Sequence, residues 1–235
     1  MLSAADDSAA SIDTWINVHA VVMLAATVVV FLLDSTIPVA AAALASFAYL
    51  LIRRGQAASK RRATGRYAHQ LTLLRLLLLC YAAWRIGDID SRWLLVLFSG
   101  NVLLDVIDGF IARRLNQATQ FGMIFDREVD AIYVLVACLY FNIATGIAAW
   151  ILVPGLLPYA YRLVAWAMGN PSIAGQRQSL AAFLAGVNFV LLLIAIAVPQ
   201  DYRVGVLVIS TAIVTLSFLV SFWRLVRHRY ESPVL

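Results

Sequence analysis

Charged residues and cysteines are scarce in this sequence. Only 13% of its 235 residues are charged, whereas 63% are hydrophobic. Soluble globular domains usually carry about 25% charged and about 45–50% apolar residues. The composition therefore argues against a water-soluble domain and indicates that the bilayer is the solvent. The two cysteines, Cys80 and Cys138, lie in apolar runs without metal-site spacing, so we expect two buried structural thiols.

Two further features are missing from the chain. Residues 1–13 contain acidic side chains but no basic n-region, so we do not expect a cleaved signal peptide. The net charge of +5 comes without an aromatic and basic platform or a nucleic-acid-binding motif, so no nucleic acid is expected as a partner. Basic residues that flank membrane helices account for this charge.

Long apolar runs predict an all-α, polytopic membrane protein with about eight transmembrane helices. Their expected ranges are 14–33, 37–52, 71–84, 93–112, 121–140, 148–168, 180–198 and 204–223. With a cytoplasmic N-terminus, most arginines and lysines fall in cytoplasmic segments, as the positive-inside rule requires. The basic stretch 56–68 is expected either to lie on the anionic leaflet or to form a solvated loop.

Acidic residues gather between positions 105 and 130, where two of the predicted helices follow each other. Asp105 and Asp108 are three residues apart, and Asp126 and Asp130 are four apart, so each pair shares one helix face. A short connection makes the two helices antiparallel neighbours. We therefore expect the four carboxylates to converge near the cytoplasmic membrane boundary, where each intramembrane charge is a functional hypothesis.

Four carboxylates this close together must bind protons or cations. Their hard oxygen ligands favour Mg²⁺, Mn²⁺ or Ca²⁺. Gly109, Ala112 and Gly122 leave room beside the acids, and Arg113 stands next to them, well placed for a phosphate. The pattern therefore indicates a metal-bound diphosphate. The alternative is a set of helix-end charges that pair with neighbouring arginines.

Residues 105–130 read D-x2-D-G-x2-A-R-x8-G-x3-D-x3-D. This pattern resembles the signature of the CDP-alcohol phosphotransferase family (the CDP-alcohol phosphatidyltransferases) at all eight fixed positions. The six predicted helices from His69 onward are also similar to the family core. The resemblance implies an N-terminal extension with two transmembrane helices at 1–55, a basic juxtamembrane segment at 56–68 and a six-helix core at 69–235.

The resemblance implies a site for two divalent metals, Mg²⁺ or Mn²⁺. Asp105, Asp108 and Asp126 would be metal ligands, and Asp130 would complete the second metal site or act as general base. The nucleotide-binding residues would be Gly109, Ala112, Gly122 and Arg113. The family commonly forms homodimers, so a homodimer is expected.

One part of the sequence departs from the family. Many members carry P-N-x-L-T-x-x-R at the start of the first core helix, whereas residues 68–75 read A-H-Q-L-T-L-L-R. Thr72 and Arg75 match, and Thr72 is expected among the nucleotide contacts. The missing Pro and Asn put the other nucleotide contacts at this end in doubt. His69 borders this side, whereas His19 and His228 are not spaced as ligands and are expected to be incidental.

The resemblance implies a phospholipid-synthesis enzyme that transfers a phosphatidyl group from CDP-diacylglycerol, or a similar CDP-alcohol, to an alcohol acceptor and releases CMP. Arg162 lies in an apolar run and Arg177 in the turn that follows, so both are candidates for binding an acceptor phosphate, such as that of glycerol 3-phosphate. Snorkelling or pairing with a helix-end carboxylate is the alternative for Arg162. Serine, choline, inositol phosphate and phosphatidylglycerol remain possible acceptors.

Two other functions compete with this interpretation. A catalytically silent CDP-lipid-binding homologue would be expected to have lost one or more of the aspartates, and all four are present. A transporter with a carboxylate relay would place its acids near the bilayer midplane and show inverted repeats, which we do not find in the sequence. We therefore expect an enzyme, placed in a bacterial inner membrane with its site facing the cytoplasm.

Overall fold

The computed structural model describes residues 3–58, 66–114, 120–169 and 179–231. In these ranges the chain forms eight α-helices and one short 3-10 helix, and no strand. The helices are α1 (Ser3–Leu33), α2 (Ile37–Ala58), α3 (Arg66–Trp84), α4 (Ser91–Arg114), α5 (Gln120–Ile143), α6 (Val153–Ala167), α7 (Ser179–Ala197) and α8 (Gln200–Glu231), with the 3-10 helix η1 (Ala149–Leu152) before α6. The predicted all-α class is confirmed, and the eight α-helices form at about the predicted positions. Most of the basic stretch 56–68 lies outside the described residues.

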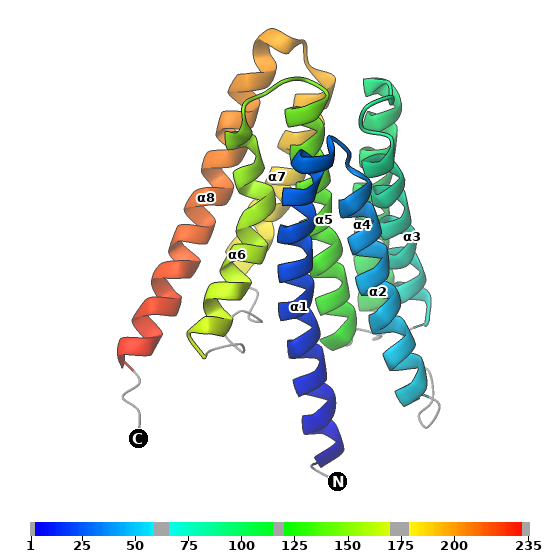
Figure 1. The fold of residues 1–235 in the computed structure, drawn as a ribbon, viewed down its shortest axis with the longest axis vertical. Coiled ribbons are helices and arrows are strands. Elements are labelled where there is room, and N and C mark those ends of the chain that lie inside the picture. The colour runs from blue at the N-terminus through cyan, green and yellow to red at the C-terminus, as the bar shows by residue number, and fades with distance from the viewer. Residues whose placement is uncertain (1–2, 59–65, 115–119, 170–178, 232–235) are drawn as a thin grey trace.

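Four helical segments are long and apolar enough to cross a membrane: Ile12–Leu33, Ser91–Phe110, Leu180–Ala197 and Gln200–Arg227. Two further apolar helices, Ile37–Arg53 and Gln70–Trp84, are shorter. The outer surface of the bundle carries large exposed apolar side chains, as a lipid-facing surface requires. α1 begins and α8 ends at the same end of the bundle, the lower end in Figure 1.

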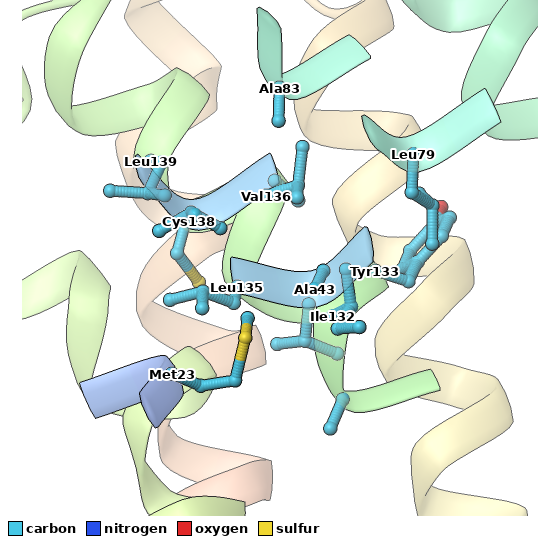
Figure 2. Packing of buried hydrophobic residues seen from close by; sticks show 14 of the residues in the cluster. Met23, Ala43, Leu79, Ala83, Ile132, Tyr133, Leu135, Val136, Cys138 and Leu139 are labelled. Atoms are coloured by element: carbon cyan, nitrogen blue, oxygen red, sulfur yellow. The ribbon is translucent and has the colours of Figure 1, made fainter. Parts of the chain in front are cut away.

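α5 is the central helix of the bundle, and residues 131–141 on it are all buried. It packs against α3 and α6, while α1 packs against α2 and α6, and α2 packs against α3. Figure 2 shows Met23 of α1 and Ala43 of α2 beside the side chains of α5 in this core. The first two helices are therefore part of the same hydrophobic core as the other six.

The predicted helix at 148–168 is divided in the structure. Ala149–Leu152 form the 3-10 turn η1, and the α-helix begins at Val153, with a proline at its start. Proline is tolerated there because the first N–H groups of a helix have no partner within it. Gly155 follows this proline, and here α6 crosses α5 closely. A Cβ at position 155 would lie only 2.8 Å from the Cα of Leu135, so the crossing requires a residue without a side chain.

Gly155→Ala is expected to destabilise the protein, because the added methyl group overlaps the backbone of α5. Overpacking of this kind costs about 1–3 kcal/mol, and the melting temperature in detergent should fall by several degrees. Gly205→Ala is the matched control, because nothing lies within 4 Å of a Cβ at that position. Equal melting temperatures for the two variants would contradict the close crossing.

Candidate active site

Three of the four predicted carboxylates meet between α4 and α5. Asp105 comes from α4, and Asp126 and Asp130 come from α5. One oxygen from each lies within 4.8 Å of the other two. The four-residue spacing of Asp126 and Asp130 puts both on one face of α5, and together with Asp105 of α4 they form one oxygen-rich cluster.

Arg75 of α3 stands in the middle of this carboxylate cluster. Its Nη1 lies 2.8 Å from Oδ1 of Asp105 and also bonds Asp126, while its Nη2 lies 2.7 Å from Oδ1 of Asp130. The side chain is only 1% exposed. A buried guanidinium neutralises the repulsion between carboxylates and fixes their orientation through its several donors.

Asn101 of α4 holds Arg75 in place from the other side. Its Oδ1 accepts a hydrogen bond from Arg75 Nε at 3.3 Å, and its Nδ2 donates to the backbone carbonyl of Arg75 at 2.9 Å. The sequence pattern matched Arg75 to the family but gave it no part in the site, and it did not single out Asn101. The available signal was a lone arginine within an apolar run, because such a charge needs a partner inside the protein.

Asp108 lies one turn beyond Asp105 and has a different environment. Its Oδ2 accepts a hydrogen bond of 2.6 Å from the hydroxyl of Thr72. Its Oδ1 is buried and finds no hydrogen-bond partner among the residues that the structure describes. Thr72 was expected at the nucleotide, and the structure shows it orienting a carboxylate.

The donor set of this cluster suits a divalent cation. Carboxylate oxygens are the preferred ligands of Mg²⁺ and Mn²⁺. Asp105, Asp126 and Asp130 converge, and the second oxygen of Asp108 has unused accepting capacity nearby. The residues present therefore fit a metal site of the kind that the sequence predicts, without deciding which metal it prefers.

The remaining predicted nucleotide contacts belong to α4 and α5. Gly109 and Gly122 are half-buried positions of α4 and α5. Ala112 and Arg113 belong to the last turns of α4. Arg177 lies outside the described residues, so its predicted contact with the acceptor stays a prediction.

Arg162 of α6 is buried and engaged by α1. Its Nη2 lies 3.0 Å from Oδ1 of Asp13, and its Nε donates to Oδ1 of Asn17 at 3.0 Å. Pairing with a carboxylate was one of the two interpretations of this arginine, and the structure shows that pairing. The guanidinium thus ties the first helix of the chain to α6, and its predicted contact with an acceptor phosphate stays a prediction.

A cavity of about 720 Å³ lies among α1, α5, α6, α7 and α8. Asp130 lines it together with Arg162 and Asp13, and apolar side chains such as Leu184 and Phe189 form much of the rest. Since Asp130 also belongs to the carboxylate cluster, the cavity reaches the candidate metal centre. A mostly apolar pocket with a few convergent polar groups is the usual form of a small-molecule site.

A lipid-facing helical bundle whose half-buried carboxylate cluster borders a cavity has the features of a membrane enzyme. The model of the family described as CDP-alcohol phosphatidyltransferase matches residues 66–223, more than half of the chain, and the chain belongs to this family. No curated protein and no solved structure was found to match it. Membership makes the protein an integral membrane transferase, and the predicted family is confirmed. Helices α1 and α2 precede the matched region.

Proposed function

We propose that the protein transfers a phosphatidyl group from CDP-diacylglycerol, or a similar CDP-alcohol, to an alcohol acceptor and releases CMP. The family supports the transfer from a CDP-alcohol. The main structural support for the reaction at this site is the location of Asp130, which belongs to the carboxylate cluster and also lines the cavity. A hydroxyl group that reacts in the cavity would therefore lie next to Asp130 and next to the carboxylates that would hold the metals.

The residues of the cluster divide the work between them. Asp105, Asp108 and Asp126 would hold two divalent cations, Mg²⁺ or Mn²⁺, while Arg75 keeps the carboxylates of Asp105, Asp126 and Asp130 together. When bound, these cations neutralise the diphosphate and stabilise the charge on the departing CMP. The acceptor oxygen forms a bond to the phosphorus next to the lipid while the bond from that phosphorus to the CMP oxygen breaks. Asp130 accepts the hydroxyl proton, or completes the second metal site.

Further contacts are part of the same proposal. In this proposal the cytidine nucleotide binds next to the glycines, the alanine and the arginine of the signature, and the acceptor binds next to two arginines. The nucleotide contacts are Gly109, Ala112, Arg113, Gly122 and Thr72, and the acceptor contacts are Arg162 and Arg177. Glycerol 3-phosphate is the first acceptor to test, because its phosphate matches the guanidinium of Arg162 in the cavity.

The setting that we propose is a bacterial inner membrane, with the site facing the cytoplasm and the protein acting as a homodimer. The distribution of basic residues supports the orientation. The family supports the dimer only by analogy.

CMP release from CDP-diacylglycerol by the detergent-purified protein tests the proposal. With Mg²⁺ or Mn²⁺, release should depend on the acceptor, and EDTA should abolish it because the carboxylates alone cannot neutralise a diphosphate. Added metal should restore the activity, and Asp126→Ala should remove it. Absence of release with every acceptor would favour a silent CDP-lipid-binding homologue, whereas release that EDTA does not affect would contradict the metal site.

A further inference from the structure

A second group of polar side chains, two buried and one half-buried, lies outside the carboxylate cluster, with members on α1, α5 and α6. It consists of His19, Glu128 and Tyr159. The Nδ1 of His19 lies 2.8 Å from the hydroxyl oxygen of Ser46, and its Nε2 lies 3.9 Å from Oε2 of Glu128. His19 is fully buried, and Tyr159 is 1% exposed.

These side chains have hydrogen-bonding capacity that the described part of the chain does not use. The Nε2 of His19 and the hydroxyl of Tyr159 both lack a hydrogen-bond partner there. A separation of 3.9 Å between His19 and Glu128 is too long for a direct hydrogen bond. Leaving such groups unsatisfied inside a protein is costly, so their retention calls for a bound partner.

Aromatic packing fixes this polar group in position. The ring of His19 stacks on Trp15 at 5.1 Å between centroids, and Phe47 of α2 contacts it edge-on at 5.3 Å. Tyr159 approaches the same ring at 6.0 Å. Trp15 of α1 and Phe47 of α2 therefore fix the position of the imidazole, which lies beside Glu128.

Glu128 and Tyr159 line the same cavity as Asp130. A carboxylate accepts hydrogen bonds and a phenol can donate one, so together they suit a hydroxyl group, which does both. An ammonium group only donates. The other acidic groups of the lining already have cationic partners, since Asp13 pairs with Arg162 and Asp130 pairs with Arg75.

Arg127 adds further positive charge to the wall of the cavity. Apart from Glu128, a cationic acceptor would meet Arg127 and two acids that already pair with arginines, so the rest of the lining offers it little attraction. An uncharged hydroxyl group gains hydrogen bonds without this opposition.

We propose that Glu128 and Tyr159 bind a second hydroxyl group of the acceptor, so that the acceptor is an alcohol with two or more hydroxyl groups. His19 is a positioning residue: it is anchored by Ser46, its ring packs against Tyr159, and it lies beside Glu128. This inference rests on the proposed transferase function, and it gives α1, which lies before the family match, a part in acceptor selection. One hydroxyl reacts at Asp130 while another is held at the polar group of His19, Glu128 and Tyr159.

The test compares glycerol, glycerol 3-phosphate and inositol with serine, ethanolamine and choline, each of which carries one hydroxyl group. The purified wild-type protein should use a polyhydroxy acceptor best. In Tyr159→Phe the KM for that acceptor should rise about two- to tenfold, as expected for one lost hydrogen bond, with the KM for CDP-diacylglycerol unchanged. Tyr202→Phe is the control, because Tyr202 is 68% exposed and does not line the cavity.

Two further variants separate binding from folding. Glu128→Gln should raise the acceptor KM in the same way. His19→Phe keeps an aromatic ring in the stack but removes the nitrogen, and it should raise the acceptor KM without changing the donor KM. A general loss of stability would instead lower the amount of active protein and leave both KM values alone.

The outcomes distinguish this inference from the proposed function. Preference for an amino alcohol, or an unchanged acceptor KM in Tyr159→Phe, overturns the hydroxyl site while the transferase stands. If no acceptor supports CMP release, the transferase proposal fails. The site is then judged by the rise in melting temperature that inositol causes: a larger rise in wild type than in Tyr159→Phe supports it, and equal rises overturn it.

Discussion

Asp130→Asn should lower acceptor-dependent CMP release by about 10²–10⁴-fold, the range that a general base contributes, while the protein still folds. The amide keeps the shape of the carboxyl group and can still accept the hydrogen bond from Nη2 of Arg75, which is 2.7 Å away. It cannot take a proton from the acceptor. Turnover measured at saturating acceptor and metal, together with the melting temperature, checks this prediction.

A metal titration of the same variant separates the two roles that Asp130 can have. If Asp130 only completes a metal site, a high Mn²⁺ concentration should recover much of the activity. If it is the base, activity should stay low at every metal concentration. Asp201→Asn, an exposed carboxylate in the first turn of α8, is the matched control. Turnover near that of wild type at ordinary metal concentration would exclude both roles.

Arg75→Ala is expected to cause a large loss of stability. The change leaves Asp105, Asp126 and Asp130 close together without their shared cation. Removing one partner of a buried ion pair typically costs about 3–5 kcal/mol. The melting temperature in EDTA should therefore drop sharply, and it should recover more with Mg²⁺ or Mn²⁺ than that of wild type, because a cation replaces part of the missing charge.

Arg85→Ala provides the comparison for this effect. Arg85 pairs with Asp88 at 3.5 Å, but both side chains are exposed, 38% and 74% respectively. Such a surface pair contributes at most about 1 kcal/mol, so the melting temperature should hardly change. A similar small effect for Arg75→Ala, or recovery with metal no greater than in wild type, would show that Arg75 does not hold the carboxylates together.

The division of the predicted helix 148–168 into η1 and α6 shows that hydropathy alone does not locate the start of a helix. The apolar run at 148–168 predicts one helix, but η1 and α6 divide it at Val153. Hydropathy alone does not mark that point, and the local signal for a break is Pro154, because proline is favoured in the first turn of a helix. Contact with α5 at Gly155 is a property of packing.

The carboxylate cluster was predictable because its geometry is local. Helical spacing predicted Asp126 and Asp130 on one face, and the small sequence separation of the two helices predicted Asp105 next to them, where the structure has it. The spacing of Asp105 and Asp108 predicts that they share a helix face. In the structure, however, Asp108 accepts a hydrogen bond from Thr72 of another helix. That hydrogen bond joins residues 36 positions apart, and no periodicity reveals it.

His19 is a second residue whose contacts come from distant parts of the chain. Its sequence neighbours show no ligand spacing, so it was expected to be incidental, but it lies between Ser46, Glu128 and Tyr159 in the core. Arg162 is similar, since its partner Asp13 is 149 positions away. Buried polar pairs of this kind form only when distant helices meet.

The sequence by itself determined the membrane environment, the eight helices, the family and the acidic face, because apolar length and helical spacing are local properties of the chain. Only the tertiary structure decided that Arg75 shares its charge among three aspartates, that Asp13 of α1 lines the cavity, and that polar groups from three helices meet. The physical reason is that a buried charge or hydrogen bond is satisfied by whichever group the packing brings within about 3 Å, and packing is a property of the whole bundle.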